Sequence, residues 1–158
     1  MKKHFIGFLI LIAAITSLNG KATSWETDYE RAFERALLED KPLLLFFTGS
    51  DWCVWCHKLD LEVFGVAVFA DGIDRFAVPV LLDFPQRRRL PPAQAKINRV
   101  LRDRWKVEAF PTVLLVDSQT GSLLWRHSYL AIEASAYLEA IEKASEAFKN
   151  SRREYRSR

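Results

Sequence analysis

Apolar residues along the chain gather into short runs that are separated by amphipathic stretches. Two continuous apolar runs, residues 43–47 and 76–84, are typical of strands buried on both faces of a sheet. A third strand is predicted at residues 113–116, and a fourth begins at 123–125, after the turn residues 117–122. The last two strands are close enough in sequence to form a hairpin.

Between and around these strands, apolar residues recur at helical spacing. Residues 23–40 are predicted as a helix that precedes the first strand, with Thr23 and Glu26 as a capping box and Pro42 just after its end. The order of helices and strands predicts an α/β fold with a mixed central sheet, helices on both faces and an extra N-terminal helix. The other helices are predicted at residues 53–64, 93–105 and 132–149, with Gly65 and Gly72 bounding a short segment after the first of them.

The first 22 residues have the three parts of a secretory signal. A basic start and an apolar run over residues 5–15 lead to small residues ending at Ala22, after which cleavage is predicted. The run is shorter than the roughly 18 to 20 apolar residues of a membrane-spanning helix, which argues against the alternative of an uncleaved anchor. The sequence therefore predicts export of a single domain at residues 23–149, followed by a disordered basic tail at 150–158.

Loss of the signal changes the charge of the protein. Three of the 23 lysines and arginines (Lys2, Lys3 and Lys21) lie in it, and the rest balance the 20 acidic residues. The mature chain is thus expected to be near neutral, although the whole chain has a pI of 8.9. Basic patches remain at residues 87–89 and 152–158. Since no aromatic stacking pattern accompanies them, we expect solvated surface there and no nucleic-acid partner.

The two cysteines lie in one short motif, Trp52-Cys53-Val54-Trp55-Cys56-His57. A disulfide between them closes a very small loop and removes little entropy from the unfolded chain, so it is a poor structural staple. The motif falls where a buried strand ends and a helix begins, and unpaired N–H groups and the helix dipole stabilise a thiolate there. Cys53 is predicted to be the exposed nucleophile, and Cys56, one turn later, to resolve the mixed disulfide.

This motif, followed about 55 residues later by Phe110-Pro111-Thr112, resembles the thioredoxin superfamily, and within it the exported bacterial Dsb-type branch. The resemblance covers residues 25–149. It implies a thioredoxin-like fold and a monomeric periplasmic enzyme that exchanges disulfides with exported proteins and needs no cofactor or metal. It also implies that Pro111 is cis and packs beside the cysteines, so that Phe110 can pair with an incoming peptide. A membrane redox partner, DsbD-like if the protein is a reductase, must then reset the pair.

The chain departs from thioredoxin itself at positions that tune redox behaviour. Val54-Trp55 stands where thioredoxin has Gly-Pro, the strand at 43–47 carries no buried acid, and a bulky Phe110 precedes the proline. A reductase is favoured because no cation lies between the cysteines to stabilise the thiolate, and an oxidase or isomerase of the same fold is the alternative. Trp52 and Trp55 are expected to form an apolar rim that receives the substrate peptide.

Two alternatives come from other functional classes. The five residues 53–57 match a CxxCH haem c attachment motif, and the two thiolates with His57 could carry Cu(I) or zinc. A haem needs a second axial ligand, for which the mature chain offers only His127 and no methionine. A closed metal site needs a second cluster of cysteines or histidines, which the chain lacks. Thiol-disulfide exchange is therefore favoured, with an electrostatic role for His57.

Overall fold

The structure, a computed structural model, describes residues 22–156, and every predicted strand and helix is present there with shifted ends. The strands are β1 (Leu43–Thr48), β2 (Val78–Asp83), β3 (Thr112–Val116) and β4 (Leu123–His127). The helices are α1 (Tyr29–Leu38), α2 (Val54–Leu59), α3 (Ala67–Gly72), α4 (Pro92–Arg104) and α5 (Ala134–Arg156). A π-helical turn (Asp60–Phe64) continues α2, and a 3-10 turn (Ile73–Arg75) follows α3.

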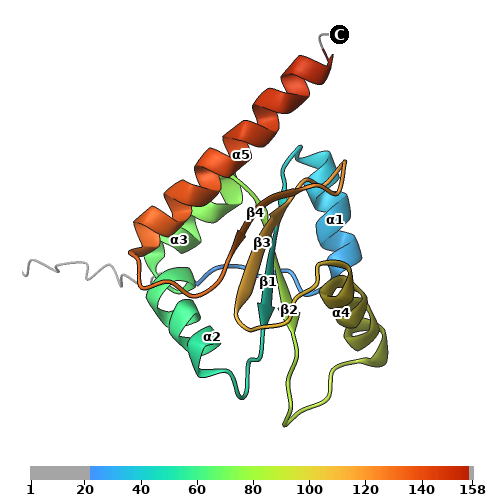
Figure 1. Ribbon diagram of the computed structural model, residues 1–158, viewed down its shortest axis with the longest axis vertical. Coiled ribbons are helices and arrows are strands. Elements are labelled where there is room, and N and C mark those ends of the chain that lie inside the picture. Colours follow the sequence, from blue (N-terminus) through green and yellow to red (C-terminus); the bar gives the residue numbers. More distant parts are fainter. Residues whose placement is uncertain (1–21, 157–158) are drawn as a thin grey trace, which may run out of the picture.

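The strands form one mixed sheet in the order β2-β1-β3-β4. β1 runs parallel to β2 and antiparallel to β3, and β3 and β4 form the predicted antiparallel hairpin. Helices α1 and α4 cover one face of the sheet, while α2, α3 and α5 cover the other (Figure 1). The predicted α/β fold, with helices on both faces of a mixed sheet and a helix before β1, is confirmed.

The central strand β1 supplies side chains to a hydrophobic core on each face of the sheet. Leu44 and Phe46 pack with residues of α2, α3 and α5, whereas Leu43, Leu45 and Phe47 pack with residues of α1 and α4. All residues of β1 are buried, which explains why its sequence is a continuous apolar run and does not alternate. The two cores hold β1 rigidly, and the segment that leaves its carboxyl end carries the cysteines.

The first helix begins later than predicted, because the residues before it follow the sheet. Glu26 forms a parallel bridge with Val80 of β2, and Asp28 is the N-cap of α1, its carboxylate accepting the N–H of Arg31 at 3.2 Å. The predicted capping box was wrong. The Thr23 hydroxyl donates instead to the carbonyl of Phe64, at 2.6 Å. This extended segment covers the edge of β2.

The tail predicted to be disordered from residue 150 is helical as far as Arg156. No glycine or proline interrupts α5, and the Arg152 guanidinium lies over the Phe148 ring and pairs with the carboxylate of Asp40, just after α1. These contacts extend the helix beyond its predicted end. Among residues 22–156, no helix is both long and apolar enough to cross a membrane. The predicted secretory signal, apart from Ala22, lies outside the described residues.

Candidate active site

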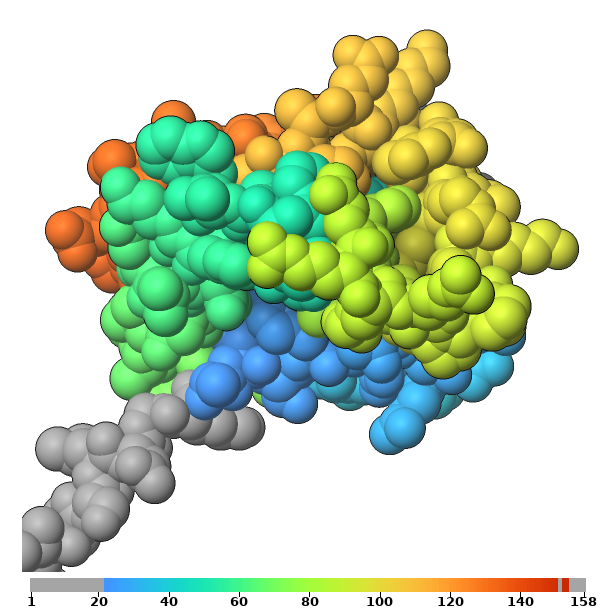
Figure 2. Space-filling view, turned by 90° about the horizontal axis from the view of Figure 1, so that it is seen from below, coloured from blue at the N-terminus to red at the C-terminus, as the bar shows by residue number. Residues whose placement is uncertain are grey.

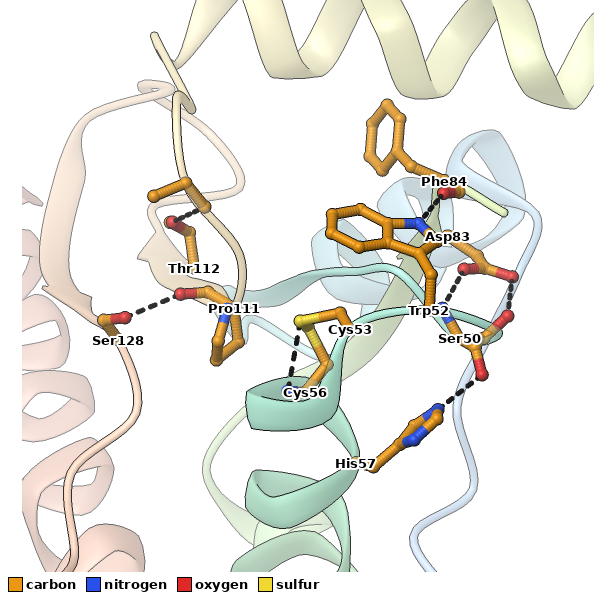
Figure 3. Close-up of a disulfide and its surroundings, with 11 residues drawn as sticks. Ser50, Trp52, Cys53, Cys56, His57, Asp83, Phe84, Pro111, Thr112 and Ser128 are labelled. Carbon is orange, nitrogen blue, oxygen red and sulfur yellow. Dashed lines mark hydrogen bonds between the residues drawn. A yellow bond between two sulfur atoms is a disulfide. The ribbon is translucent and has the colours of Figure 1, made fainter. Parts of the chain in front are cut away.

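Cys53 and Cys56 form a disulfide at the start of α2, beyond the carboxyl end of β1 (Figure 3). Cys53 is the N-cap of the helix, and its Sγ accepts the backbone N–H of Cys56 at 3.2 Å. Cys53 is 5% exposed and Cys56 1% exposed. Cys53 is therefore the more accessible of the two, but it is far less exposed than we expected, because both cysteines belong to the hydrophobic core between α2 and the sheet.

The electrostatic surroundings of the pair come from the backbone. An N–H that donates to Cys53 Sγ, at the positive end of a helix, favours the thiolate over the thiol when the disulfide is reduced. The carboxylate of Asp51 accepts the N–H groups of Gln86 and Arg87 at 2.9 and 2.7 Å, and these bonds lower the pKa of that carboxyl. The Asp51 carboxylate therefore binds the loop after β2.

Trp52 is fixed across the loop that precedes the cysteines. Its indole Nε1 donates to the Phe84 carbonyl at 2.8 Å, and its ring meets the Phe110 ring edge-on at a centroid distance of 5.7 Å. Gly49 makes room for the indole, since a Cβ there would lie 2.4 Å from it. The residue keeps 36% of its surface exposed beside the disulfide.

The peptide bond between Phe110 and Pro111 is cis, as the resemblance implied. Pro111 faces the disulfide in Figure 3, and its carbonyl accepts the Ser128 hydroxyl at 2.8 Å. The Phe110 backbone makes no hydrogen bond within the part of the chain that the structure describes, and its ring packs on Phe84 at 5.2 Å. A free N–H and C=O next to the cysteines can pair with an extended peptide.

The remaining predicted site residues lie on the first turn of α2. Val54 and Trp55 are 73% and 55% exposed, and Trp55 packs against Tyr129, with the Lys58 ammonium over both rings. His57 Nε2 lies 2.6 Å from the Ser50 carbonyl oxygen, so this nitrogen donates, and the imidazole ties α2 to the preceding loop. The first turn thus presents an apolar, partly cationic surface to solvent.

Sequence analysis missed a buried polar network behind Trp52. Asp83 ends β2 and is only 3% exposed; its carboxylate accepts the backbone N–H and the hydroxyl of Ser50, at 2.9 and 2.6 Å, and pairs with Arg88. Asn98 of α4, also buried, donates to the Asp83 carbonyl at 2.8 Å. The signal that could have revealed it is an acid at the end of an otherwise apolar strand.

Related contacts fix the position of the loop at residues 85–91, for which the sequence predicted no function. Its first residues bond to Asp51, and Arg88 reaches Ser50 and Asp83, so the loop is held beside the active site. Figure 2 shows this face of the molecule, with the yellow-green loop directly against the teal segment that carries the cysteines. Site and basic loop therefore form one surface.

The geometry also bears on the two alternatives from other classes. Both sulfurs that a haem or metal ion would use are joined to each other, and His57 is turned to a carbonyl oxygen. Among residues 22–156, no group of three or more His, Cys, Asp or Glu side chains is placed to hold a metal ion. What the arrangement can do chemically is exchange its disulfide with another thiol or disulfide.

Comparisons with known proteins agree with this chemistry. The family model of a thioredoxin-like domain matches residues 29–145. The disulfide bond reductase DsbH of Chlamydia pneumoniae is 33% identical over 120 residues, which are 76% of this chain and 71% of that protein. A solved DsbH oxidoreductase superposes with a TM-score of 0.74 at 29% identity, covering 92% of this chain and 95% of the other. The reduced C-terminal domain of Neisseria meningitidis DsbD, at 22% identity and a TM-score of 0.53 over 73% of this chain and 92% of its own, shares the fold.

Proposed function

Since the chain belongs to the thioredoxin-like family and is a thiol-disulfide oxidoreductase of the DsbH kind, we propose that it reduces disulfides in exported proteins. The observation that carries the proposal is the arrangement of the redox pair. Cys53 caps α2 with its sulfur on a backbone N–H, at the more accessible position, and Cys56 lies behind it in the core. This order supports Cys53 as the nucleophile and Cys56 as the resolving residue.

The reaction then runs in two exchange steps. The Cys53 thiolate attacks one sulfur of the client disulfide; that S–S bond breaks, and the second client sulfur leaves as a thiolate that takes up a proton. Cys56 loses its proton and attacks Cys53 Sγ, so the mixed disulfide breaks and the first client sulfur leaves and is protonated in turn. Two electrons have passed to the client, and the enzyme holds the Cys53–Cys56 disulfide found in this structure.

Two observations support reduction as the direction. The Chlamydia pneumoniae relative is named a disulfide bond reductase. In addition, Cys53 Sγ receives one backbone N–H, and no side chain of residues 22–156 donates a hydrogen bond to it. A strongly stabilised thiolate makes a pair oxidising, as in DsbA, so a single backbone donor favours a more reducing pair.

Export and resetting of the pair complete the proposal. Residues 1–22 act as a secretory signal that is cleaved after Ala22, which puts the enzyme in the periplasm. There a membrane electron donor of the DsbD kind returns the pair to the dithiol. N-terminal sequencing of the protein recovered from a periplasmic fraction tests this step, and the expected first residue is Thr23.

The reduction potential of the pair is the first measurement. Equilibration in graded thiol buffers, followed through the fluorescence of Trp52 and Trp55, is expected to give a value near the roughly −270 mV of thioredoxin. A value near the roughly −120 mV of DsbA would overturn the direction and make the protein a disulfide donor.

Trapping tests the roles of the two sulfurs. Cys56→Ser is expected to accumulate mixed disulfides with client proteins, because Cys53 can attack while nothing resolves the product. Cys53→Ser is the matched control and is expected to trap none. Trapping by Cys53→Ser alone would reverse the assignment.

A further inference from the structure

A pocket lined by arginines opens beside the active site, between the loop after β2 and helix α4. Its volume is about 350 Å³, and its wall includes Asp83 at the end of β2 and Phe84 just after it. Four cationic side chains line it, and all of them are arginine: Arg88, Arg89, Arg99 and Arg102. A planar guanidinium matches a carboxylate with two parallel hydrogen bonds, which a lysine ammonium cannot do.

Two of these arginines are already engaged within the protein. Arg88 pairs with the Asp83 carboxylate, and Arg102 pairs with Asp103 while lying over the Phe84 ring at 5.8 Å. Arg89 and Arg99 are exposed, and neither side chain makes a hydrogen bond or ion pair with any other residue in 22–156. They are therefore free to bind an external anion.

The acid of the pocket offsets the charge of Arg88 and leaves Arg89 and Arg99 uncompensated. Asp83 is the one acidic residue in the lining, and its carboxylate is buried and taken by Ser50 and Arg88. The mature chain as a whole is near neutral, so the pocket is a local concentration of positive charge and not part of a generally basic surface.

The pocket is joined to the redox pair through aromatic side chains. Phe84 lines the pocket and accepts the Trp52 indole N–H through its carbonyl, and its ring packs on Phe110, which precedes Pro111. Trp52 in turn is bonded directly to Cys53 along the chain. A segment that presents a cysteine to Cys53 and crosses this aromatic rim reaches the arginines next.

We propose that this arginine pocket binds carboxylate side chains of client proteins that lie close in sequence to the cysteine under attack. The inference rests on the proposed function and adds a substrate preference to it. Clients with an acidic segment beside the disulfide are captured faster, because opposite charge raises the rate of encounter and holds the segment across the rim.

The test uses two disulfide-linked reporter peptides that differ only in charge. One carries glutamates on both sides of its cysteine and the other carries glutamines, and a fluorophore-quencher pair reports cleavage. The reduced full-length mature protein is mixed with each in a stopped-flow instrument. We expect the glutamate peptide to react about five- to tenfold faster at low ionic strength, and this preference to shrink as salt screens the charges.

The Arg89→Gln/Arg99→Gln variant is expected to lose the preference and to reduce the glutamine peptide at the wild-type rate. The control variant, Lys96→Gln/Lys149→Gln, removes the same charge from exposed positions outside the pocket and is expected to keep the preference. Equal rates for the two peptides with the wild-type protein would overturn the proposal. So would an equal loss of preference in the control variant, which would reveal a net-charge effect.

The outcomes separate this inference from the proposed function. If the wild-type protein reduced neither peptide, the reductase proposal itself would fail. Phosphatidylglycerol vesicles test the other source of anions. Binding of these vesicles by the wild-type protein but not by the arginine variant, together with equal peptide rates, would assign the pocket to a membrane surface and overturn the client proposal.

Discussion

The two sides of the cysteine pair differ in how they are held. On the β2 side, each of the three residues before Cys53 forms a hydrogen bond with the segment around the end of β2. On the β4 side, Trp55 contacts Lys58 and Tyr129 at the protein surface. The first flank is anchored by a buried carboxylate, Asp83, and by the Trp52 indole bond. The second consists of ring and cation contacts around Trp55, which is 55% exposed. The cysteines thus lie between a fixed flank, the hydrogen-bonded loop at residues 50–52, and an adaptable flank, the surface contacts around Trp55.

The difference follows from the energies of the two kinds of contact. A hydrogen bond to a buried charge stabilises by about 1.5–3 kcal/mol, whereas an exposed cation–π contact or ion pair contributes about 0.5–1 kcal/mol or less. Strong, directional contacts on the β2 side fix the loop that leads into Cys53. Weak contacts on the β4 side can be exchanged for contacts with different clients at little cost. The comparison predicts that substitutions on the first flank change stability, and that those on the second change client reactivity.

The largest effect is expected from removing the buried carboxylate. Asp83→Ala leaves the Ser50 N–H and hydroxyl and the Arg88 guanidinium without their acceptor, and we expect the free energy of unfolding to fall by about 2–4 kcal/mol. Urea denaturation of the oxidised protein measures it. Asp103→Ala, which removes an exposed partner of Arg102, is the control and should cost less than about 0.5 kcal/mol. Equal losses in the two variants would contradict the comparison.

The two tryptophans of the motif give a matched pair. Trp52→Phe removes the indole bond to the Phe84 carbonyl but keeps an aromatic ring near Phe110, and it should lower the free energy of unfolding by about 1 kcal/mol. Trp55→Phe keeps the ring contact with Tyr129, and the Trp55 indole makes no hydrogen bond to any other residue in 22–156, so the effect should stay below about 0.5 kcal/mol. Thermal unfolding of both variants measures the difference, and the opposite order would refute the assignment of the fixed flank.

Trp55→Ala tests the adaptable flank. Losing an exposed aromatic contact with a client is worth about 0.7 kcal/mol, so we expect the rate of reduction of a protein disulfide to fall about threefold. The rate with a small-molecule disulfide, which does not reach Tyr129, should be unchanged. Stopped-flow rates with both substrates are the measurement, and equal slowing of both would indicate that Trp55 acts on the sulfurs themselves.

The smallest effect is a pH dependence centred on Asp60, one turn after Cys56. Although the residue keeps exposed surface, partial burial raises the pKa of its carboxyl, and His57 opposes the rise. The folded state thus holds the proton more tightly than the unfolded state, so this contribution to stability is present at low pH and is lost as the pH rises through the folded pKa. Asp60→Asn should therefore be more stable than the wild type at pH 7, and the gain should vanish below about pH 3. Urea denaturation of both proteins at pH 7 and at pH 3 measures the difference in the free energy of unfolding. A variant that is less stable than the wild type at pH 7 would contradict the raised pKa of Asp60.

Where the sequence predicted the fold, the signal lay within single segments. The apolar run of β1 and the helical periodicity of α4 needed no knowledge of the rest of the chain. The start of α1 was wrong because Glu26 pairs with Val80, a partner more than 50 residues away that no local pattern reveals. The predicted end of α5 was wrong because Arg152 forms an ion pair with Asp40, which lies more than 100 residues earlier in the chain. In both cases a tertiary contact overrode local preference.

The candidate site likewise has features that local motifs predict and features that depend on long-range contacts. The cysteines, their position at a helix start and the cis Pro111 could be predicted from the two motifs and the family they resemble. Asp83, Ser50 and the bonds from Asp51 to the loop after β2 could not, because each joins residues more than 30 positions apart. The sequence therefore located the cysteine pair and missed the hydrogen bonds that fix the loop on its β2 side.

In the proposed reaction, the low exposure of Cys53 limits which disulfides the Cys53 sulfur can reach. An attacking thiolate must line up with the S–S bond it breaks, and only 5% of the surface of Cys53 is open to an approaching group. On this proposal, a disulfide on an extended stretch of chain reaches the opening more easily than one buried inside a folded protein. The proposed reductase would then act on accessible disulfides and leave buried ones intact.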